Sequence, residues 1–415
     1  MSNEINMNIT TNDTAGYIHQ MAVRARAAAS GLGALTAEAK NNALLSIAAQ
    51  LEKDEKAILE ANQKDIENAR AAGLAPAMID WLALNGGRFA GMVEGVRYVA
   101  SLPDPVGEKI WERERPSGIS IRKVRVPFGV VAVVFESRPN VFVDTAALCL
   151  KTGNAIILRG GKEAIESNKA LSLSVRAGIA AAGICEDAVQ LVEILDHAAV
   201  GEIVRSVGLV DVAIPRGGER LIKAMCEAAL IPVLKHYKGV CHIYVDDKAD
   251  LSMALAILDN AKTQRPSVCN AAECLLVHEK LAPLFLPMVR AWAADKGVSL
   301  HENGNDWERE FLALEMNVGI VADHRAAIDH INRYGSHHSD CIVTGDKTRA
   351  DEFLRDVDSS TVYHNVSTRF TDGAEFGMGA EIGISTDKLH ARGPMGLEEL
   401  TTYKYQVTGD GVVRK

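Results

Sequence analysis

Residues 126–164 read "VPFGVVAVVFESRPNVFVDTAALCLKTGNAIILRGGKEA", and this stretch decides the fold class. It contains two continuous apolar runs, Val130–Phe135 and Asn154–Arg159, and similar runs follow at 189–195 and 210–215 with amphipathic stretches between them. Such runs are typical of strands in a parallel sheet, because helices cover both faces of that sheet. The pattern predicts an α/β domain whose ligands bind where a strand meets the N-terminus of a helix.

The same alternation resumes after about residue 240 and predicts a second α/β region. Its strand-like runs are "CHIYVDD" (241–247), "ECLLVH" (273–278), "NVGIVAD" (317–323) and "CIVTGD" (341–346). Upstream of both regions, residues 14–101 have the apolar spacing of helices.

A different pattern separates the helical start from the first α/β region. Two short alternating stretches, Lys109–Arg113 and Ile119–Val126, flank the turn residues Pro116 to Gly118. This arrangement predicts a β-hairpin that projects from the body of the protein. The C-terminal residues 401–415 are predicted to form a further pair of strands that turns at Gly409–Gly411.

Composition excludes several classes of protein. The chain has 415 residues, 47% of them hydrophobic and 24% charged, with a net charge of −9, which argues against a nucleic-acid or anionic-membrane surface. No apolar run is long enough to span a membrane, and residues 1–14 are polar, so we expect a tail rather than a signal peptide. Seven cysteines without a CxxC pair indicate a reducing cytoplasm, and no Cys/His spacing predicts a metal.

Two glycine-containing turns end strands in the first α/β region. They are "LRGGKEA" with Arg159, Gly160, Gly161 and Lys162, and "IPRGGER" with Gly217 and Gly218. Glycine lets the backbone approach a ligand, and the N-terminus of a helix favours phosphate oxygens. Strand-to-helix turns also use glycine for geometry alone, so the sequence leaves both interpretations open.

Cys269 lies in "NAKTQRPSVCNAAECLLVH" (260–278) and has two interpretations. A free cysteine is most often a small buried hydrophobe. The polar residues and Pro266 before Cys269 instead predict a loop, whereas Cys274 leads into an apolar run and is the better core candidate. Arg265, four residues upstream, is a candidate to support a thiolate or to receive an anion, or is a surface arginine.

Residues 126–164 resemble the first cofactor-binding stretch of the aldehyde dehydrogenase superfamily. The motif around Cys269, "GSHHSDCIVTGD" (335–346) and "AEFGMGAEIGISTDKLHARGPMGLEELTTYK" (374–404) resemble the gamma-glutamyl phosphate reductase family within it. The resemblance implies an aldehyde-dehydrogenase-like α/β fold with two parallel-sheet domains and a projecting β-hairpin arm.

The resemblance also implies the domain boundaries. A cofactor-binding domain would comprise residues 1–104 and 127–235, and a catalytic domain would comprise residues 236–385. An oligomerisation arm would comprise residues 105–126 and 386–415, which predicts a homo-oligomer, a dimer or tetramer.

The implied activity is NADPH-dependent reduction of L-glutamyl 5-phosphate to glutamate 5-semialdehyde in proline biosynthesis, with phosphate as the second product. Cys269 matches the family's nucleophile and would form a thioester. Asn140 would donate to the oxyanion, although its spacing departs from that of the superfamily, and Glu315 would hold the nicotinamide ribose. The alternatives are a hydrolytic aldehyde dehydrogenase, a CoA-acylating relative and an inactive scaffold.

Two departures from the wider superfamily refine this interpretation. Cations stand at Arg159 and Lys162, where relatives that prefer NAD carry an acidic residue at the second place, so the sequence predicts NADP(H). Hydrolytic relatives carry a water-activating glutamate upstream of the cysteine, and the corresponding positions here are Lys235 and His236, with no glutamate from Ile231 to Val245. His236 is either a substitute base or a cation near the phosphate or cofactor.

Overall fold

The structure is a computed structural model that describes residues 14–302, 304 and 306–414, in two compact units. Unit 1 comprises residues 1–234, 379–383 and 396–415, and unit 2 comprises residues 235–378 and 384–395. The predicted polar tail lies outside the described residues except for Thr14, which begins the first helix. Among the described residues, no helix is both long and apolar enough to cross a membrane.

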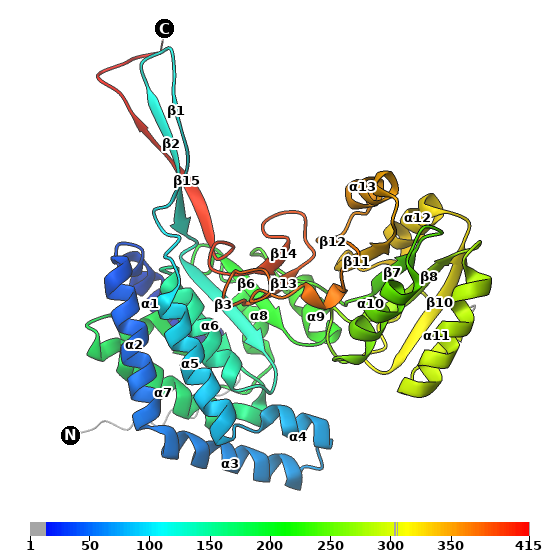
Figure 1. Cartoon of the computed structure of the whole chain (residues 1–415). Coiled ribbons are helices and arrows are strands. Elements are labelled where there is room, and N and C mark those ends of the chain that lie inside the picture. The colour runs from blue at the N-terminus through cyan, green and yellow to red at the C-terminus, as the bar shows by residue number, and fades with distance from the viewer. Residues whose placement is uncertain (1–13, 303, 305, 415) are drawn as a thin grey trace. The chain divides into compact units, whose positions relative to one another are not determined.

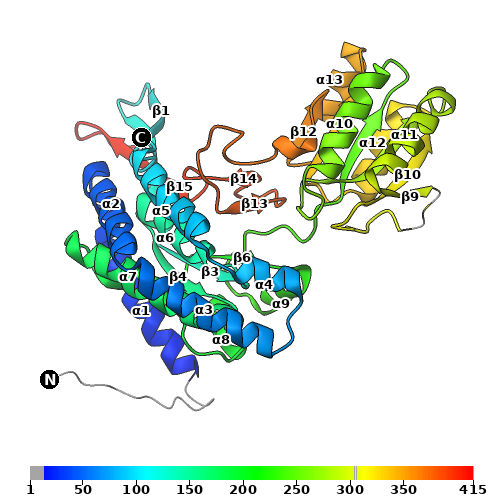
Figure 2. The ribbon, with the colours of Figure 1, turned by 60° about the horizontal axis from the view of Figure 1, so that its bottom comes forward.

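Unit 1 begins with the predicted helical region. The hydroxyl of Thr36 accepts a hydrogen bond from the Ala39 N–H and so caps the second helix. Helices α2, α3, α5 and α7 pack together through buried aliphatic side chains (Figures 1 and 2). The helices of this unit are α1 (Thr14–Leu32), α2 (Ala37–Lys53), α3 (Glu55–Ala71), α4 (Pro76–Leu82), α5 (Gly86–Ser101), α6 (Asn140–Lys151), α7 (Ile165–Ala181), α8 (Ala198–Val204) and α9 (Glu219–Ala228).

A parallel sheet forms the centre of unit 1 and confirms the expected α/β pattern. Its strand order is β5-β4-β3-β6, with β3 at Val130–Phe135, β4 at Ala155–Arg159, β5 at Val189–Leu191 and β6 at Val212–Arg216. Every residue of β3 is buried, which explains why its sequence is continuously apolar rather than alternating.

The hairpin is present as predicted, but the C-terminal strand pair is not. Strand β1 (Lys109–Glu114) pairs antiparallel with β2 (Ser120–Pro127), and the single strand β15 (Thr401–Thr408) pairs with the other edge of β2. Residues 409–414 form no strand, because β15 finds its partner in the hairpin rather than in the tail. The three strands extend away from the helices of unit 1 (Figure 1).

Unit 2 is built on a wholly parallel sheet of order β12-β11-β7-β8-β10-β9. Its strands are β7 (Cys241–Val245), β8 (Ala272–His278), β9 (Ser299–Glu302), β10 (Glu315–Val321), β11 (Ser339–Val343) and β12 (Thr361–His364). Its helices are α10 (Leu251–Thr263), α11 (Ala282–Lys296), α12 (His324–Tyr334) and α13 (Lys347–Asp356).

The two faces of this sheet have separate cores because successive strand residues point to opposite sides. Ile243 and Val245 of β7 pack in one core with apolar residues of α10 and α11. Tyr244, between them, packs in the other core with residues of α12 and α13, and its ring stacks on Phe353.

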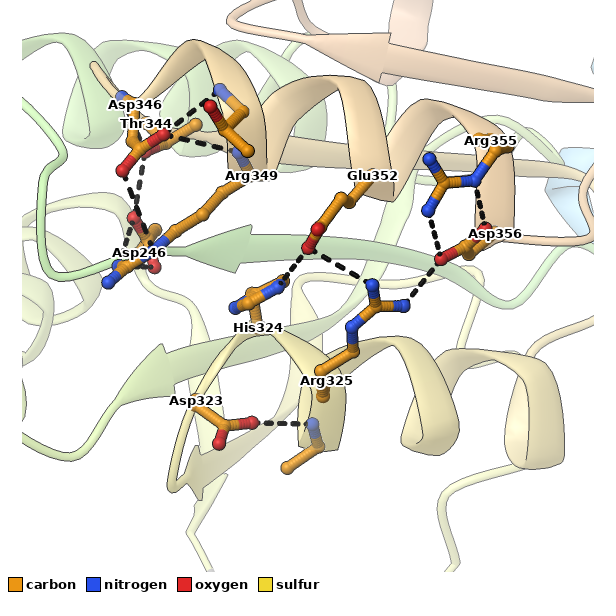
Figure 3. Close-up of polar contacts among 12 residues, drawn as sticks. Asp246, Asp323, His324, Arg325, Thr344, Asp346, Arg349, Glu352, Arg355 and Asp356 are labelled. Atoms are coloured by element: carbon orange, nitrogen blue, oxygen red, sulfur yellow. Dashed lines mark hydrogen bonds and ion pairs between the residues drawn. The ribbon is translucent and has the colours of Figure 1, made fainter.

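Polar side chains close the carboxyl edge of the sheet of unit 2. Asp246 follows β7, is fully buried, and accepts hydrogen bonds from Tyr244, Thr344 and Arg349, the last at 2.9 and 3.0 Å. Figure 3 shows this cluster beside the ion pairs that join α12 to α13, in which His324 and Arg325 contact Glu352. Each of these anions has a cationic partner from the chain itself.

Residues 384–395 belong to unit 2, whereas the sequence placed 386–415 with the arm. Lys235 forms an ion pair with Asp387 at 2.9 Å, and Lys388 and Arg392 both contact Asp358. These contacts hold the segment, which includes β14 (Gly393–Met395) and most of β13 (Gly383–Ser385), within unit 2. Only residues 396–415 group with the arm and its unit.

Candidate active site

Cys269 lies in the loop between α10 and β8, as the polar sequence around it predicts. It is half-buried, whereas Cys274 is fully buried in β8. The buried Cys241 thiol donates a hydrogen bond to the Cys269 carbonyl oxygen at 3.2 Å, which holds the loop to the start of β7. The structure therefore separates a core cysteine from a loop cysteine.

Arg369 brings a cation to this loop. Its guanidinium donates to the side chain of Gln264 at 2.9 Å and to that of Asn270, the residue after Cys269. Burial lowers the pKa of Arg369 and the neighbouring Arg265 lowers it further, while the charges of Asp372 and Cys269 oppose them. Arg265 is exposed, and the charges of Arg265 and Cys269 both act on Arg369, so the two arginines place positive charge near the thiol.

Two histidines also surround Cys269. His236, His338 and Cys269 each have a potential ligand atom within 4.8 Å of those of the other two. The rings of His236 and His338 meet edge to face at 5.6 Å between centroids. Burial and the neighbouring His236 lower the pKa of His338 to about 3, so His338 is neutral near pH 7.

The sequence did not single out His338 or Gly239 for this site. A Cβ atom built on Gly239 would lie 1.8 Å from the Cys269 carbonyl oxygen, so the backbone of the segment before β7 passes too close to Cys269 for any side chain at that position. "SHH" at 336–338 and the glycine in "HYKGVC" were the available signals, but neither spacing points to Cys269.

The first glycine turn of unit 1 follows β4. Arg159 is buried, and its guanidinium donates to the carbonyl oxygens of Gly160 and Leu195, whereas Lys162 is exposed. A Cβ on Gly160 would lie 2.3 Å from the side-chain nitrogen of Asn168. Both polar atoms of that buried amide lack a hydrogen-bond partner among the described residues.

The second glycine turn carries an acidic neighbour that the sequence did not indicate. The Gly218 N–H donates to the Glu136 carboxylate at 3.0 Å, and a Cβ on Gly217 would lie 2.7 Å from that carboxyl group. The Glu136 carboxylate thus accepts the hydrogen bond from the Gly218 N–H, which was expected to go to a phosphate.

The remaining predicted residues, Asn140 and Glu315, lie in different units. Asn140 begins α6 in unit 1, and its amide donates to Asp144 at 2.8 Å; burial raises the pKa of Asp144 to about 6. Glu315 begins β10 in unit 2 and contacts His301 at 3.0 Å. Strand β10 pairs with β8, so Glu315 and the Cys269 loop lie at the same amino edge of the sheet.

A cavity of about 610 Å³ opens in unit 2 next to the Cys269 loop. Arg369 and Gln264 line its wall, with Asp372 and Glu375 on the same lining. Apolar side chains of α10, Met253 and Ile257 among them, complete it. The cavity thus offers a cation and carboxylates to one small polar molecule.

Known proteins resemble this chain over nearly its whole length. The sequence model of the aldehyde dehydrogenase family matches residues 3–300. A gamma-glutamyl phosphate reductase of Desulforamulus reducens is 50% identical over 411 residues, which cover 96% of this chain and 99% of that protein. The chain belongs to the aldehyde dehydrogenase family, among its gamma-glutamyl phosphate reductases.

Solved structures agree with that membership and with an oxidoreductase activity. The gamma-glutamyl phosphate reductase of Thermotoga maritima has a TM-score of 0.95 and 43% identity, and the match covers 96% of this chain and all of that one. An acetylating aldehyde dehydrogenase from Geobacillus thermoglucosidasius has a TM-score of 0.70 at 14% identity over 99% of both chains, which shows a shared fold alone.

Proposed function

We propose that this enzyme reduces L-glutamyl 5-phosphate to L-glutamate 5-semialdehyde with NADPH and releases phosphate, a step of proline biosynthesis. The observation that carries the proposal is the setting of Cys269, a half-buried thiol in a polar loop beside Arg265 and Arg369. Nearby cations favour the thiolate, which is the reactive form, and favour an anionic acyl phosphate as its substrate.

The Cys269 thiolate and a hydride donor account for every bond that forms and breaks in this reaction. The Cys269 thiolate attacks the acyl carbon, the bond to the phosphate oxygen breaks, and phosphate leaves with that electron pair while a thioester remains. NADPH, when bound, supplies the hydride that reduces the thioester carbonyl. The resulting oxyanion expels the thiolate and yields the aldehyde. Arg265 is exposed near the thiol, where it would attract the leaving phosphate.

The cavity beside the loop suits the amino-acid end of this substrate. Arg369 would pair with the α-carboxylate, and Asp372 and Glu375 would attract the α-ammonium group, since all three line the cavity. An Arg369→Gln variant should raise KM for glutamyl phosphate more than it lowers kcat. A lower kcat with an unchanged KM would instead assign Arg369 to the chemical step.

For the cofactor, we propose that Lys162 pairs with the 2′-phosphate of NADP(H), while buried Arg159 supports the turn. The support is that Lys162 is exposed at the end of β4 and that Gly160 leaves no room for a side chain. Lys162→Glu should weaken NADPH binding about tenfold or more relative to NADH, since an acid there repels the phosphate. Lys53→Glu, at an exposed position of α2, is the matched control. Unchanged preference in Lys162→Glu would remove Lys162 from the site.

The alternatives differ in what accepts the acyl group: phosphate, water or CoA. The segment before β7 contains no glutamate to activate water, and a positioned general base is worth about 10²–10⁴-fold. His236 lies near Cys269 and is the one candidate substitute that this segment offers. Oxidation of the semialdehyde by NADP should therefore require phosphate or arsenate, whereas equal rates with water alone, or a requirement for CoA, would overturn the proposal.

We propose further that the arm of β1, β2 and β15 joins copies of this chain into a dimer or tetramer. Its strands expose Ile110, Tyr403, Tyr405 and Val407, and an exposed strand edge needs a covering partner. Deleting residues 403–415 should convert the oligomer to monomer in light scattering. A monomer before deletion, or unchanged assembly after it, would contradict this role.

A further inference from the structure

We propose that His236, Cys269 and His338 form a binding site for a thiophilic divalent cation, with Zn²⁺ the best fit, and that the bound cation reversibly inhibits the enzyme by occupying its nucleophile. The inhibition rests on the proposed role of Cys269, but the binding itself does not. The cation is a regulator or inhibitor under this proposal and takes no part in turnover.

The three residues come together because of the sheet topology of unit 2. Each lies in a segment that leads into a strand: His236 before β7, Cys269 before β8 and His338 immediately before β11. These strands are neighbours in the order β11-β7-β8 and run parallel, so their amino ends meet at one edge. Their potential ligand atoms lie within 4.8 Å of one another.

A hydrogen bond orients the ring of His236. Its Nδ1 lies 2.9 Å from the Ile384 carbonyl oxygen, which only accepts, so Nδ1 donates and Nε2 is the nitrogen that a metal would bind. A backbone carbonyl behind the ring is the usual support of a metal-bound histidine.

His338 supplies the observation that points to a ligand. Its Nδ1 lies 2.8 Å from the Ser339 hydroxyl, which in turn contacts Thr371 at 2.6 Å. Its Nε2 is buried and has no hydrogen-bond partner among the described residues, although the residue is 0% exposed. A buried polar atom without a partner is unfavourable, so a ligand at Nε2 would recover free energy.

The donor set and spacing suit Zn²⁺. One thiolate and two imidazoles leave a fourth position for water, and bond lengths of about 2.3 Å to sulfur and 2.0–2.1 Å to nitrogen require ligand atoms roughly 3.3–3.6 Å apart. Shifts of about 1 Å in the half-buried His236 and Cys269 side chains would close the site.

Arg265 and Arg369 limit the affinity. Their positive charge beside Cys269 opposes a dication, so binding should be weaker than at structural zinc sites. The other group of potential ligands in unit 2, Asp246, Asp247 and His278, offers no comparable site. Arg349 already donates to both carboxylates of that group.

The test titrates the full-length, metal-free protein with Co²⁺ and follows the thiolate-to-cobalt charge-transfer absorption and the visible bands of tetrahedral Co²⁺. We expect one Co²⁺ per chain, displaced by Zn²⁺, and loss of the charge-transfer band in Cys269→Ala. His338→Gln and His236→Asn should each weaken binding by about 100-fold or more, beyond the 10–100-fold cost of losing an outer-shell partner.

His337→Asn is the matched control, because it neighbours His338, lies outside the cluster and has a positive φ of 60° that asparagine tolerates. If circular dichroism shows that His338→Gln does not fold, the Co²⁺ affinity of His236→Asn provides the test instead. A wild-type protein without the charge-transfer band, or unchanged affinity in Cys269→Ala, would overturn the site.

The titration contains no substrate, so failure of the proposed reaction would leave its result intact. In the activity assay, Zn²⁺ should inhibit the wild-type enzyme and a chelator should restore the rate. Inhibition that EDTA does not reverse would contradict reversible occupation of Cys269.

Discussion

The two edges of the sheet in unit 2 each gather three side chains that are able to bind a metal, but they differ in how these side chains are satisfied. At the carboxyl edge, Asp246 accepts hydrogen bonds from Tyr244, Thr344 and Arg349. At the amino edge, His338 keeps a buried nitrogen without a partner beside Cys269. A satisfied network stabilises the fold, whereas an unsatisfied one indicates a place for a ligand.

The difference also reverses an expectation for parallel sheets. Ligands commonly bind at the carboxyl ends of the strands, yet here an internal ion pair fills that edge in unit 2. The proposed nucleophile, Cys269, instead lies at the amino edge, in the loop before β8. Substitutions at the two edges should therefore affect different quantities: activity at the amino edge and stability at the carboxyl edge.

The largest expected effect is at the amino edge. Cys269→Ser should lower kcat/KM by orders of magnitude, because a hydroxyl is a far weaker nucleophile than a thiolate. Cys274→Ser, in the buried strand β8, should keep near-normal turnover per folded molecule while losing some stability. Steady-state rates on both purified variants check this, and the reverse outcome would assign the reaction to Cys274.

Displacing the same loop without touching its chemistry should have the next largest effect. Gly239→Ala places a methyl group where the Cys269 carbonyl oxygen lies, so the loop must move. A shift of about 1 Å in a reacting group costs about 10²-fold in rate. Gly201→Ala on α8, where a Cβ meets nothing within 4 Å, should leave kcat unchanged. Equal rates for the two variants would show that the position of this backbone does not matter.

Breaking the carboxyl edge should reduce stability and spare the reaction. Arg349→Met leaves the buried Asp246 carboxylate without its cation. Loss of one partner of a buried pair costs about 3–5 kcal/mol, and because the Arg349 side chain is 27% exposed we expect the lower end of that range or less. Urea denaturation measures the change. Turnover per folded molecule that falls in parallel would contradict the division between the two edges.

The pH dependence of stability distinguishes the edges further. The pKa of His338 falls from an ordinary value near 6.5 to about 3 on folding, so the unfolded chain binds an extra proton between these values. Wild-type stability should thus decline below pH 6.5, by at most about 1.4 kcal/mol per pH unit from this group.

The His338→Gln variant lacks this pH-dependent contribution. The difference in the free energy of unfolding between the wild type and this variant (the stability gap) should therefore be smaller at pH 5 than at pH 7.5. At Asp246, burial opposes ionisation, but hydrogen bonds from Thr344, Tyr244 and Arg349 outweigh it and lower the pKa. Arg349→Met removes one of these influences, so Asp246 in the folded variant should take up a proton at a higher pH than in the wild type, and the gap for this variant should narrow at lower pH than the gap for His338→Gln. Parallel pH profiles for the two variants would contradict the assigned charge states.

Much of this architecture was predictable from residues 126–164 and from the runs after residue 240. Continuous apolar strands such as β3 are a direct consequence of burial on both faces, so their sequence pattern and their structure coincide. The loop position of Cys269 and the core position of Cys274 were predictable from the polarity of their neighbours. A strand was predicted where β15 lies, but its pairing was not, because its partner β2 lies far away in the sequence.

The candidate site was less accessible to sequence reasoning, since it depends on contacts between distant segments. His236, Cys269 and His338 have no motif spacing, and only the parallel order of β11, β7 and β8 brings them together. The Glu136 carboxylate at Gly218 was not predictable for the same reason, whereas the contact of Asn140 with Asp144, four residues later in α6, is local. Arg159 was predicted to bind the cofactor, but its guanidinium is buried and donates to backbone carbonyls, one of them in the loop after β5, which the sequence did not indicate.

The central claim is that Cys269 forms a thioester that phosphate, and not water, resolves. Rapid mixing of the enzyme with glutamate semialdehyde and excess NADP in phosphate-free buffer tests it most directly. We predict a burst of one NADPH per chain that then stops, a mass increase confined to the peptide with Cys269, and sustained turnover when phosphate is added. Continued NADPH formation without phosphate, or no burst on Cys269, would contradict the mechanism.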